Sequence, residues 1–176
     1  MAVGQGALPA VTLAEAQAFV RIETGEEEAI VAGLVRSASA LCEAFIGQVV
    51  VAREVSEMIA ASAAWQRLAA GPVRAIGTVE AIAADGSATV LGVGDYAVDI
   101  DADGGGWVRL TAGGSCGRVR VTATVGIASD RNDVPEPLRQ GIVRLVGHLF
   151  AQRDGGGGEP PAAVTALWRP YRRIRL

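Results

Sequence analysis

The stretch EAFIGQVVVAREV, residues 43–55, changes from one hydrophobic period to another at Gly47. Before Gly47, apolar residues recur at spacings of three and four, which is typical of an amphipathic helix. Glycine readily ends a helix because it adopts the left-handed conformation without strain. After it, Val49, Val51 and Val55 fall on the same side of a period of two, and the polar residues 53, 54 and 57 stand among and after them, as in a half-buried strand. The stretch therefore predicts a helix that ends at Gly47 and a β-region that starts at residue 48.

Two helix starts precede this stretch. Thr12 and Glu15 form a Ser/Thr-x-x-Glu capping box, and Thr24 with Glu27 repeats it. The acidic residues 26–28 would lie at the positive end of the second helix dipole, which favours them there. We expect the core face of this long helix to consist of apolar residues at helical spacing: Ile30, Leu34, Ala38, Leu41 and Phe45.

The middle of the chain has the pattern of an antiparallel β-module of about 75 residues. A strand is expected over residues 73–83, and Asp85-Gly86 after it is a strong hairpin-turn signal. Residues 118–125 alternate between valine or alanine on one face and arginine or threonine on the other. Further short strands are predicted at residues 89–91, 96–100 and 107–110.

A helical pattern returns near the C-terminus. Asp133 is the expected N-cap and Pro135 the first helical residue. The apolar stripe of this late helix comprises Leu138, Ile142, Leu145, Val146 and Leu149. Glycines 155–158 and the prolines 160–161 then predict a flexible loop.

Together these patterns predict an α+β fold with an interrupted helical part. Residues 1–47 and 131–154 would form a small helical bundle, in which the late helix packs on the long helix. Residues 48–130 would form the inserted antiparallel β-module. Residues 155–176 would form a flexible loop and an extended C-terminal tail.

Composition limits the classes of function. The chain has 176 residues, its 16 cationic residues are all arginine, and its net charge is -3. A protein that coats DNA through its phosphates needs a strong basic surplus, so this balance argues against that class. Because we find no run of about 18 apolar residues and no signal-peptide pattern, we expect a soluble, unsecreted protein. Cys42 and Cys116 lie far apart and are expected to be buried, reduced thiols.

One acidic segment has part of a metal-binding pattern. Asp99, Asp101 and Asp103 match the first half of a calcium loop. The twelfth position, where such a loop needs a bidentate acid, is Leu110, and strands flank the segment instead of helices. We therefore expect a structural or electrostatic hairpin loop and no metal site. His148 flanks an apolar stripe without a nucleophile motif beside it, so no catalytic group is predicted.

Several segments, taken in order, resemble the head-tail connector, or adaptor, family of tailed bacteriophages and phage-like gene transfer agents. The similarity covers nearly the whole chain, and each segment alone has a common pattern. The segments that carry it are residues 13–22, the acids 26–28, and residues 43–47, 95–99, 119–126, 134–142 and 170–176.

The resemblance implies a structural virion protein and no enzyme, with neither a cofactor nor a metal. A ring of about twelve copies would sit between a portal protein and a tail-side stopper or head-completion protein. The ring would extend the channel through which DNA passes without sequence-specific binding. The implied location is the neck of a virion or phage-like particle, assembled in the bacterial cytoplasm without contact to a membrane.

The C-terminal tail is the predicted portal-docking element. It combines aromatic and arginine side chains, which dominate interface hot spots, with a terminal aliphatic pair. The predicted docking residues are Trp168, Arg169, Tyr171, Arg172, Arg173, Ile174, Arg175 and Leu176. Two alternatives remain open: a small metal- or ligand-binding protein that uses the loop 99–103, and a DNA-binding module that uses the arginine-rich C-terminus.

Overall fold

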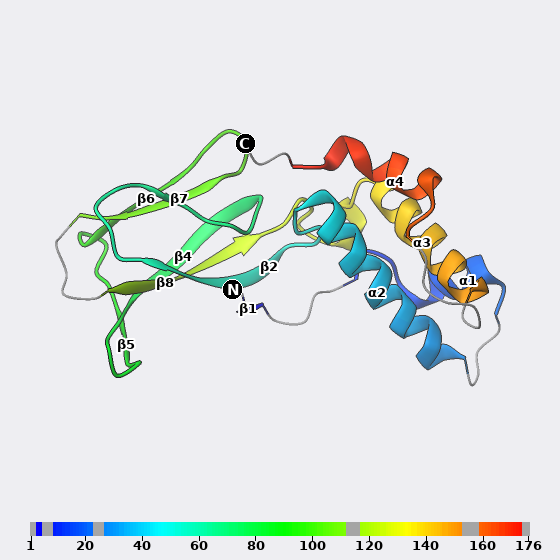
Figure 1. Cartoon of the computed structure of the whole chain (residues 1–176), viewed down its shortest axis with the longest axis horizontal. Helices are drawn as coiled ribbons and strands as arrows, with labels where there is room; N and C mark the ends of the chain where they lie inside the picture. Colours follow the sequence, from blue (N-terminus) through cyan, green and yellow to red (C-terminus); the bar gives the residue numbers. More distant parts are fainter. Residues whose placement is uncertain (1–2, 5–8, 23–26, 112–116, 153–158, 174–176) are drawn as a thin grey trace. The chain divides into compact units, whose positions relative to one another are not determined.

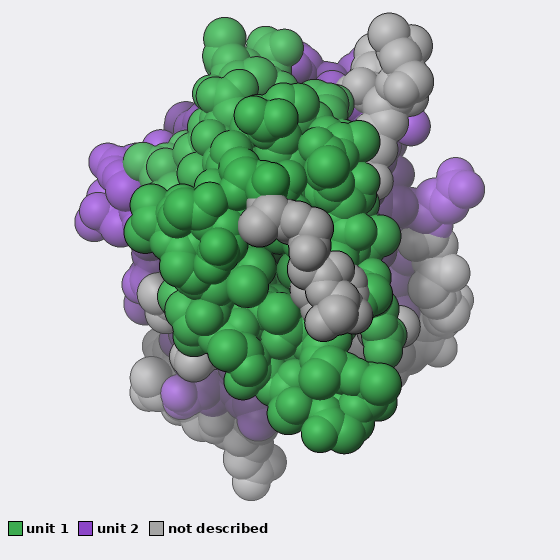
Figure 2. Space-filling model, turned by 90° about the vertical axis from the view of Figure 1, so that its left-hand side faces the viewer, with its two compact units in different colours: residues 1–7, 52–127 green, residues 8–51, 128–176 purple. Residues whose placement is uncertain are grey.

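The computed structural model describes residues 3–4, 9–22, 27–111, 117–152 and 159–173 of the chain (Figure 1). The chain divides into two compact units, coloured separately in Figure 2. The helical unit consists of residues 8–51 and 128–176, and the β unit consists of residues 1–7 and 52–127. Helices and two antiparallel sheets together make an α+β fold, as predicted.

Four α-helices and two short 3-10 helices build the described part of the helical unit. They are α1 (Leu13–Val20), α2 (Glu28–Ile46), η1 (Arg131–Asp133), α3 (Glu136–Ala151), α4 (Ala162–Trp168) and η2 (Arg169–Tyr171). The capping box that opens α1 is present, because Thr12 Oγ1 accepts from the Glu15 amide at 3.1 Å and Glu15 Oε2 accepts from the Thr12 amide at 2.7 Å. Glu15 also pairs with Arg139, which ties the start of α1 to α3.

The core of this unit lies where α3 packs on α2, as the sequence predicted. Four of the five predicted stripe residues of α3 are buried: Leu138, Ile142, Leu145 and Val146. Leu149, the fifth, is half-buried near the end of the helix. The period of 3.6 residues therefore identified the correct face of α3.

The core face of α2 differs from the predicted one. The buried residues are Val31, Val35, Ala38, Cys42 and Ile46, so the core face is rotated by about one residue. Ile30 and Leu41 from the predicted stripe are exposed by 47% and 42%. The helix carries two adjacent apolar faces, and tertiary packing uses only one of them as the core.

Two predicted boundaries are also wrong. Asp133 belongs to η1 and its carboxylate contacts the Ser129 hydroxyl, whereas α3 begins at Glu136 after Pro135. Residues 49–51 are not a regular strand. They belong to the helical unit, where the Val50 amide donates to Glu43 Oε1 at 2.9 Å. The predicted second capping residue, Thr24, lies outside the described residues.

The β unit contains two antiparallel sheets. The larger has the order β1-β2-β8-β4-β5, and the smaller has the order β3-β7-β6. The strands are β1 (Val3–Gly4), β2 (Arg53–Ala60), β3 (Gln66–Arg67), β4 (Val73–Ile82), β5 (Ala88–Val90), β6 (Tyr96–Ile100), β7 (Gly106–Leu110) and β8 (Arg118–Val125). The first and third of these were not predicted, because each has only two residues and no alternation to detect.

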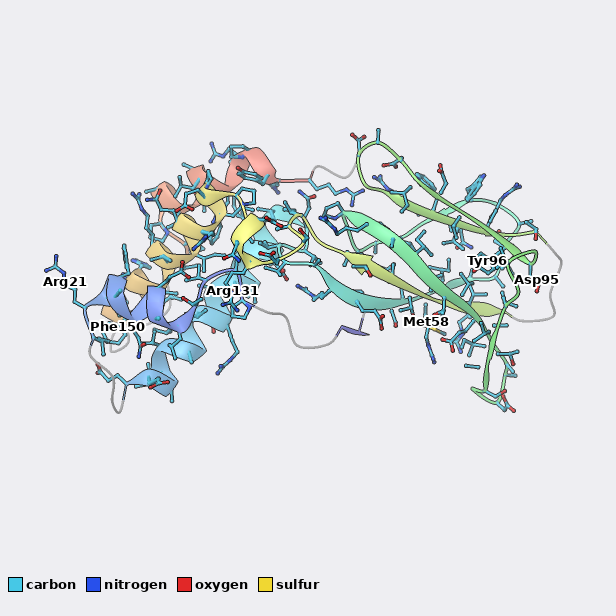
Figure 3. The ribbon with its side chains drawn as sticks, turned by 180° about the vertical axis from the view of Figure 1, so that it is seen from behind. Arg21, Met58, Asp95, Tyr96, Arg131 and Phe150 are labelled. Carbon is cyan, nitrogen blue, oxygen red and sulfur yellow. The ribbon has the colours of Figure 1, made fainter. Side chains whose placement is uncertain are left out.

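The alternation in β8 sets the inner and outer faces of the larger sheet. Its valines and Ala123 are buried, while its arginines and threonines face outward. On the outer face, Met58 of β2 pairs across from Arg120 and its side chain projects away from the sheet (Figure 3). The predicted hairpin turn is present, with Gly86 at φ 88°, a backbone angle that glycine adopts without strain.

The core of the helical unit gives a direct test. Leu145 is fully buried between helices, so Leu145→Ala should lower the free energy of unfolding by about 2–5 kcal/mol through lost burial and a residual cavity. Urea denaturation would measure the change. Arg144→Ala, at the neighbouring exposed position, should stay within about 0.5 kcal/mol of the parent. Equal stability of the two variants would contradict the assigned core.

Candidate interaction surfaces

The C-terminal segment folds onto the helical unit. Trp168, at the end of α4, has an exposed fraction of 0%. Its ring lies 5.9 Å from the ring of Phe45 on α2, and its Nε1 donates to the Leu138 carbonyl of α3 at 3.4 Å. The absence of a side chain at Gly141 makes room for the indole, because a Cβ there would overlap Trp168 Nε1. One indole therefore joins α2, α3 and α4.

The backbone beyond Trp168 is also anchored. The Arg173 amide donates to the Ile46 carbonyl at 2.8 Å, and Gln48 Nε2 donates to the Tyr171 carbonyl at 2.6 Å. The carbonyls at a helix end have no partner within the helix, so Arg173 satisfies one of those left at the end of α2. The Arg172 guanidinium lies 5.8 Å from the Phe45 ring centre, a cation–π distance.

These contacts revise the predicted docking element. Trp168 is a core side chain and cannot be an exposed docking group in this conformation. Residues 162–173 pack with the helical unit and do not form a separate extended tail. Arg169 and Arg172 are exposed, whereas Tyr171 and Arg173 are half-buried. The predicted docking residues Ile174, Arg175 and Leu176, and the glycine run 155–158, lie outside the described residues.

The acidic loop between β6 and β7 is organised by Asp101. Its Oδ1 accepts from the amides of Asp103 at 3.0 Å and Gly105 at 2.6 Å, and its Oδ2 accepts from Trp107 Nε1 at 2.9 Å. The hydrogen bond from Trp107, then that from Gly105, holds the pKa of Asp101 below its usual value. Gly104, at φ 73°, lets the turn approach Pro72 closely.

Protein donors thus occupy both oxygens of the central predicted calcium-loop acid. Asp99 and Asp103 are exposed on either side of it. Within the described ranges, no group of three or more histidine, cysteine or acidic side chains is placed to hold a metal ion. The arrangement stabilises a tight turn, so we assign Asp101 a structural role.

The outer face of the smaller sheet carries a surface that sequence reasoning missed. Register pairs Arg67 of β3 with Trp107 of β7, and the Arg67 guanidinium lies 5.6 Å from the Trp107 ring centre. One step along, the Arg109 guanidinium lies 5.0 Å from the ring centre of Trp65, which is 44% exposed. The four side chains alternate as a two-by-two Trp–Arg block. The sequence shows Trp-x-Arg and Trp-x-Arg at 65–67 and 107–109, but only the strand register brings them together.

The groups considered for catalysis lie elsewhere. Cys42 is a free thiol in the helical core, as predicted, and burial raises its pKa to about 12. A thiol with so high a pKa is a poor nucleophile at neutral pH. His148 is half-buried near the end of α3. Cys116 lies outside the described residues.

Solved structures with the same fold come from gene transfer agent (GTA) particles. A chain in the neck of an empty GTA particle, computed with C6 symmetry, superposes with a TM-score of 0.80 at 23% identity, covering 100% of this chain and 97% of the other. Chains in the neck of a native GTA particle with C12 symmetry and in a native GTA virion give 0.78 and 0.77 at 22% identity with the same coverage. Neither a protein-family model nor a curated protein matches the sequence. The likeness establishes the fold over the full length of the chain.

The close approach of the Trp168 indole to Gly141 predicts opposite effects on stability when alanine replaces glycine at two helical positions. Gly141→Ala should destabilise by about 1–3 kcal/mol, because the new methyl group displaces Trp168. Gly33→Ala on α2 should stabilise by about 0.5–1 kcal/mol, because the nearest atom to its new Cβ, on Arg36, is 3.8 Å away and alanine favours helix. Thermal unfolding followed by tryptophan fluorescence would measure both. Equal shifts of the two melting temperatures in the same direction would contradict this account of Gly141.

The Asp101 turn predicts a pH-dependent contribution to stability. A carboxylate with a lowered folded pKa stabilises the protein above its unfolded pKa of about 3.9, and the effect is lost as pH falls through the folded value. Asp101→Asn should therefore lower the melting temperature at pH 7, with the difference from the parent shrinking at pH 3. Asp103→Asn, at an exposed position of the same turn, should change little at either pH. An Asp101→Asn difference that is equal at both pH values would contradict this role of the carboxylate.

Proposed function

We propose that this chain is a structural neck component, a head-tail adaptor, of a gene transfer agent or related tailed particle. Copies of it would form a ring of about twelve between the portal and the tail-side proteins, and the ring would extend the DNA channel. The role is structural and requires no catalytic group. The observation that carries the proposal is the full-length match to chains in GTA necks.

The surface chemistry agrees with an assembly role. The Trp–Arg block exposes the two residue types most enriched at interface hot spots, on a sheet face of the β unit. Asp99 lies beside Trp107 in the register, and Asp101 is bonded to Trp107 and interacts with the charge of Arg67. The two carboxylates therefore offset the positive charge of the block and weaken its attraction for an anion such as DNA phosphate. A protein surface is the better partner for this face, and we assign it to tail-side contacts.

We further propose that the C-terminal end docks on the portal. The anchored residues 168–173 would fix the starting point of the terminal segment. The exposed residues Arg169 and Arg172 belong to this anchored segment and would suit an acidic portal surface. In this form of the proposal, Trp168 positions the docking segment from inside the core and does not itself touch the partner.

A stop codon after Arg173 tests the docking proposal, because it keeps every contact described for residues 159–173. The truncated chain should unfold at the parental temperature but should fail to retain the portal in a pull-down, and tailless heads should accumulate. Arg144→Glu, an exposed change on α3, is the matched control and should support normal tailing.

Two other outcomes would contradict separate parts of the proposal. Portal retention and normal tails with the truncated chain would show that the docking surface lies elsewhere. Normal tailed particles after deletion of the whole gene would show that the chain has no neck role.

A further inference from the structure

The second apolar face of α2 is largely exposed, and none of its own residues is charged, although Arg36 Nη2 lies 3.8 Å from where a Cβ of Gly33 would stand and so reaches the edge of the face. It follows the core face around the helix and contains Ile30, Gly33, Leu34, Ser37, Ala40, Leu41 and Ala44. We call these seven residues the uncharged face of α2. The positions 30, 33, 37, 40 and 44 keep a spacing of three and four over two heptads, which is the spacing of a helix–helix seam.

A surface helix of a globular protein normally turns charged residues to solvent. The only charged residues in α2 are Glu28, Arg36 and Glu43, and none belongs to the uncharged face. An 18-residue window of α2 reaches a mean hydropathy of 1.6, yet only 28% of it is buried within the protein. Within the described residues, α1, α3 and α4 pack on α2 and still leave Ile30 and Leu41 substantially exposed. A further partner is needed to remove this face from water.

The shape of the face favours a helix as that partner. Glycine, serine and alanine occupy four of the five seam positions, so the axis of a second helix could approach to the short end of the usual range of about 8–10 Å. Ile30, Leu34 and Leu41 stand along the seam and would supply most of the buried apolar area.

The charges of α2 argue against a membrane as the partner. Helices that lie on membranes carry lysine and arginine along their polar face. Here the residues at the N-terminal end are the acids Glu27 and Glu28, and α2 has a single arginine, Arg36. Anionic lipid would be repelled by that acidic end.

We propose that the uncharged face of α2 packs against a helix of the neighbouring copy in the neck ring. This inference rests on the proposed neck function. The matched chains stand in necks of C6 and C12 symmetry, and a closed ring requires each copy to present two different lateral surfaces to its two neighbours. The uncharged face is one of those two surfaces.

Site-specific photo-crosslinking in assembled particles tests the contact. A benzoylphenylalanine at Ser37, in the middle of the face, should give a product of twice the chain mass, and mass spectrometry should find a helix of the same protein in it. The same probe at Ala14, an exposed position on α1, is the reference for crosslinking outside the face. A Ser37 product that contains a different protein, or no Ser37 product from particles that hold the chain, would overturn the inference and leave the neck role intact. Absence of the parental chain from particles would instead overturn the neck role.

A charge substitution gives a second, independent measurement. Leu41→Glu changes a partly exposed side chain, so the purified chain should remain folded with a nearly parental melting temperature. Its copy number in purified particles should fall at least about tenfold, while Ala14→Glu should be incorporated at the parental level. Normal incorporation of a folded Leu41→Glu chain would overturn the inference. Binding of the parental chain to phosphatidylglycerol vesicles that Leu41→Glu abolishes would also overturn it, in favour of a lipid partner.

Discussion

Three helices of the helical unit meet on the side chain of Trp168. Only 5% of the chain is aromatic, and much of the helical core consists of valine, alanine and leucine. A single indole therefore supplies a large part of the buried area on which α4 depends. The indole fits against α3 because residue 141 is glycine, and its Nε1 donates to the Leu138 carbonyl of α3. The position of α4 thus depends on the side chain of Trp168 and on the absence of a side chain at Gly141.

The fold class could be predicted from the sequence because the two hydrophobic periods are well separated along the chain. In β8 every second residue is buried, and a period of two leaves only two choices of face, of which one is apolar. In α2 the same reasoning failed. Two adjacent faces are both apolar, and the choice between them depends on where α1 and α3 pack, which no local pattern contains.

The candidate surfaces were harder to predict from the sequence than the fold was. An aromatic and arginine-rich terminus has the composition of an interface, but composition does not show that Trp168 turns inward. The Trp–Arg block depends on the register of β3, a strand of two residues, with β7. The failed calcium spacing predicted only a structural or electrostatic loop, and the hydrogen bonds of Asp101 could not be predicted, because they depend on the turn that brings two backbone amides and the Trp107 indole to its carboxylate.

The larger segment of the β unit, residues 52–127, begins and ends at adjacent points of the helical unit. Val51 and Ala128 form a parallel bridge, and the Ala128 amide donates to the Val50 carbonyl at 2.9 Å. Residues 52–127 therefore leave the helical unit and return to it through two adjacent backbone positions. Inserted domains with adjacent ends impose little loop-closure cost on their host. Such a junction can accept β segments of different size or sequence while the helical part stays the same, so recombination between related genes could exchange residues 52–127 as one segment, provided that the new segment still offers an edge strand to β1.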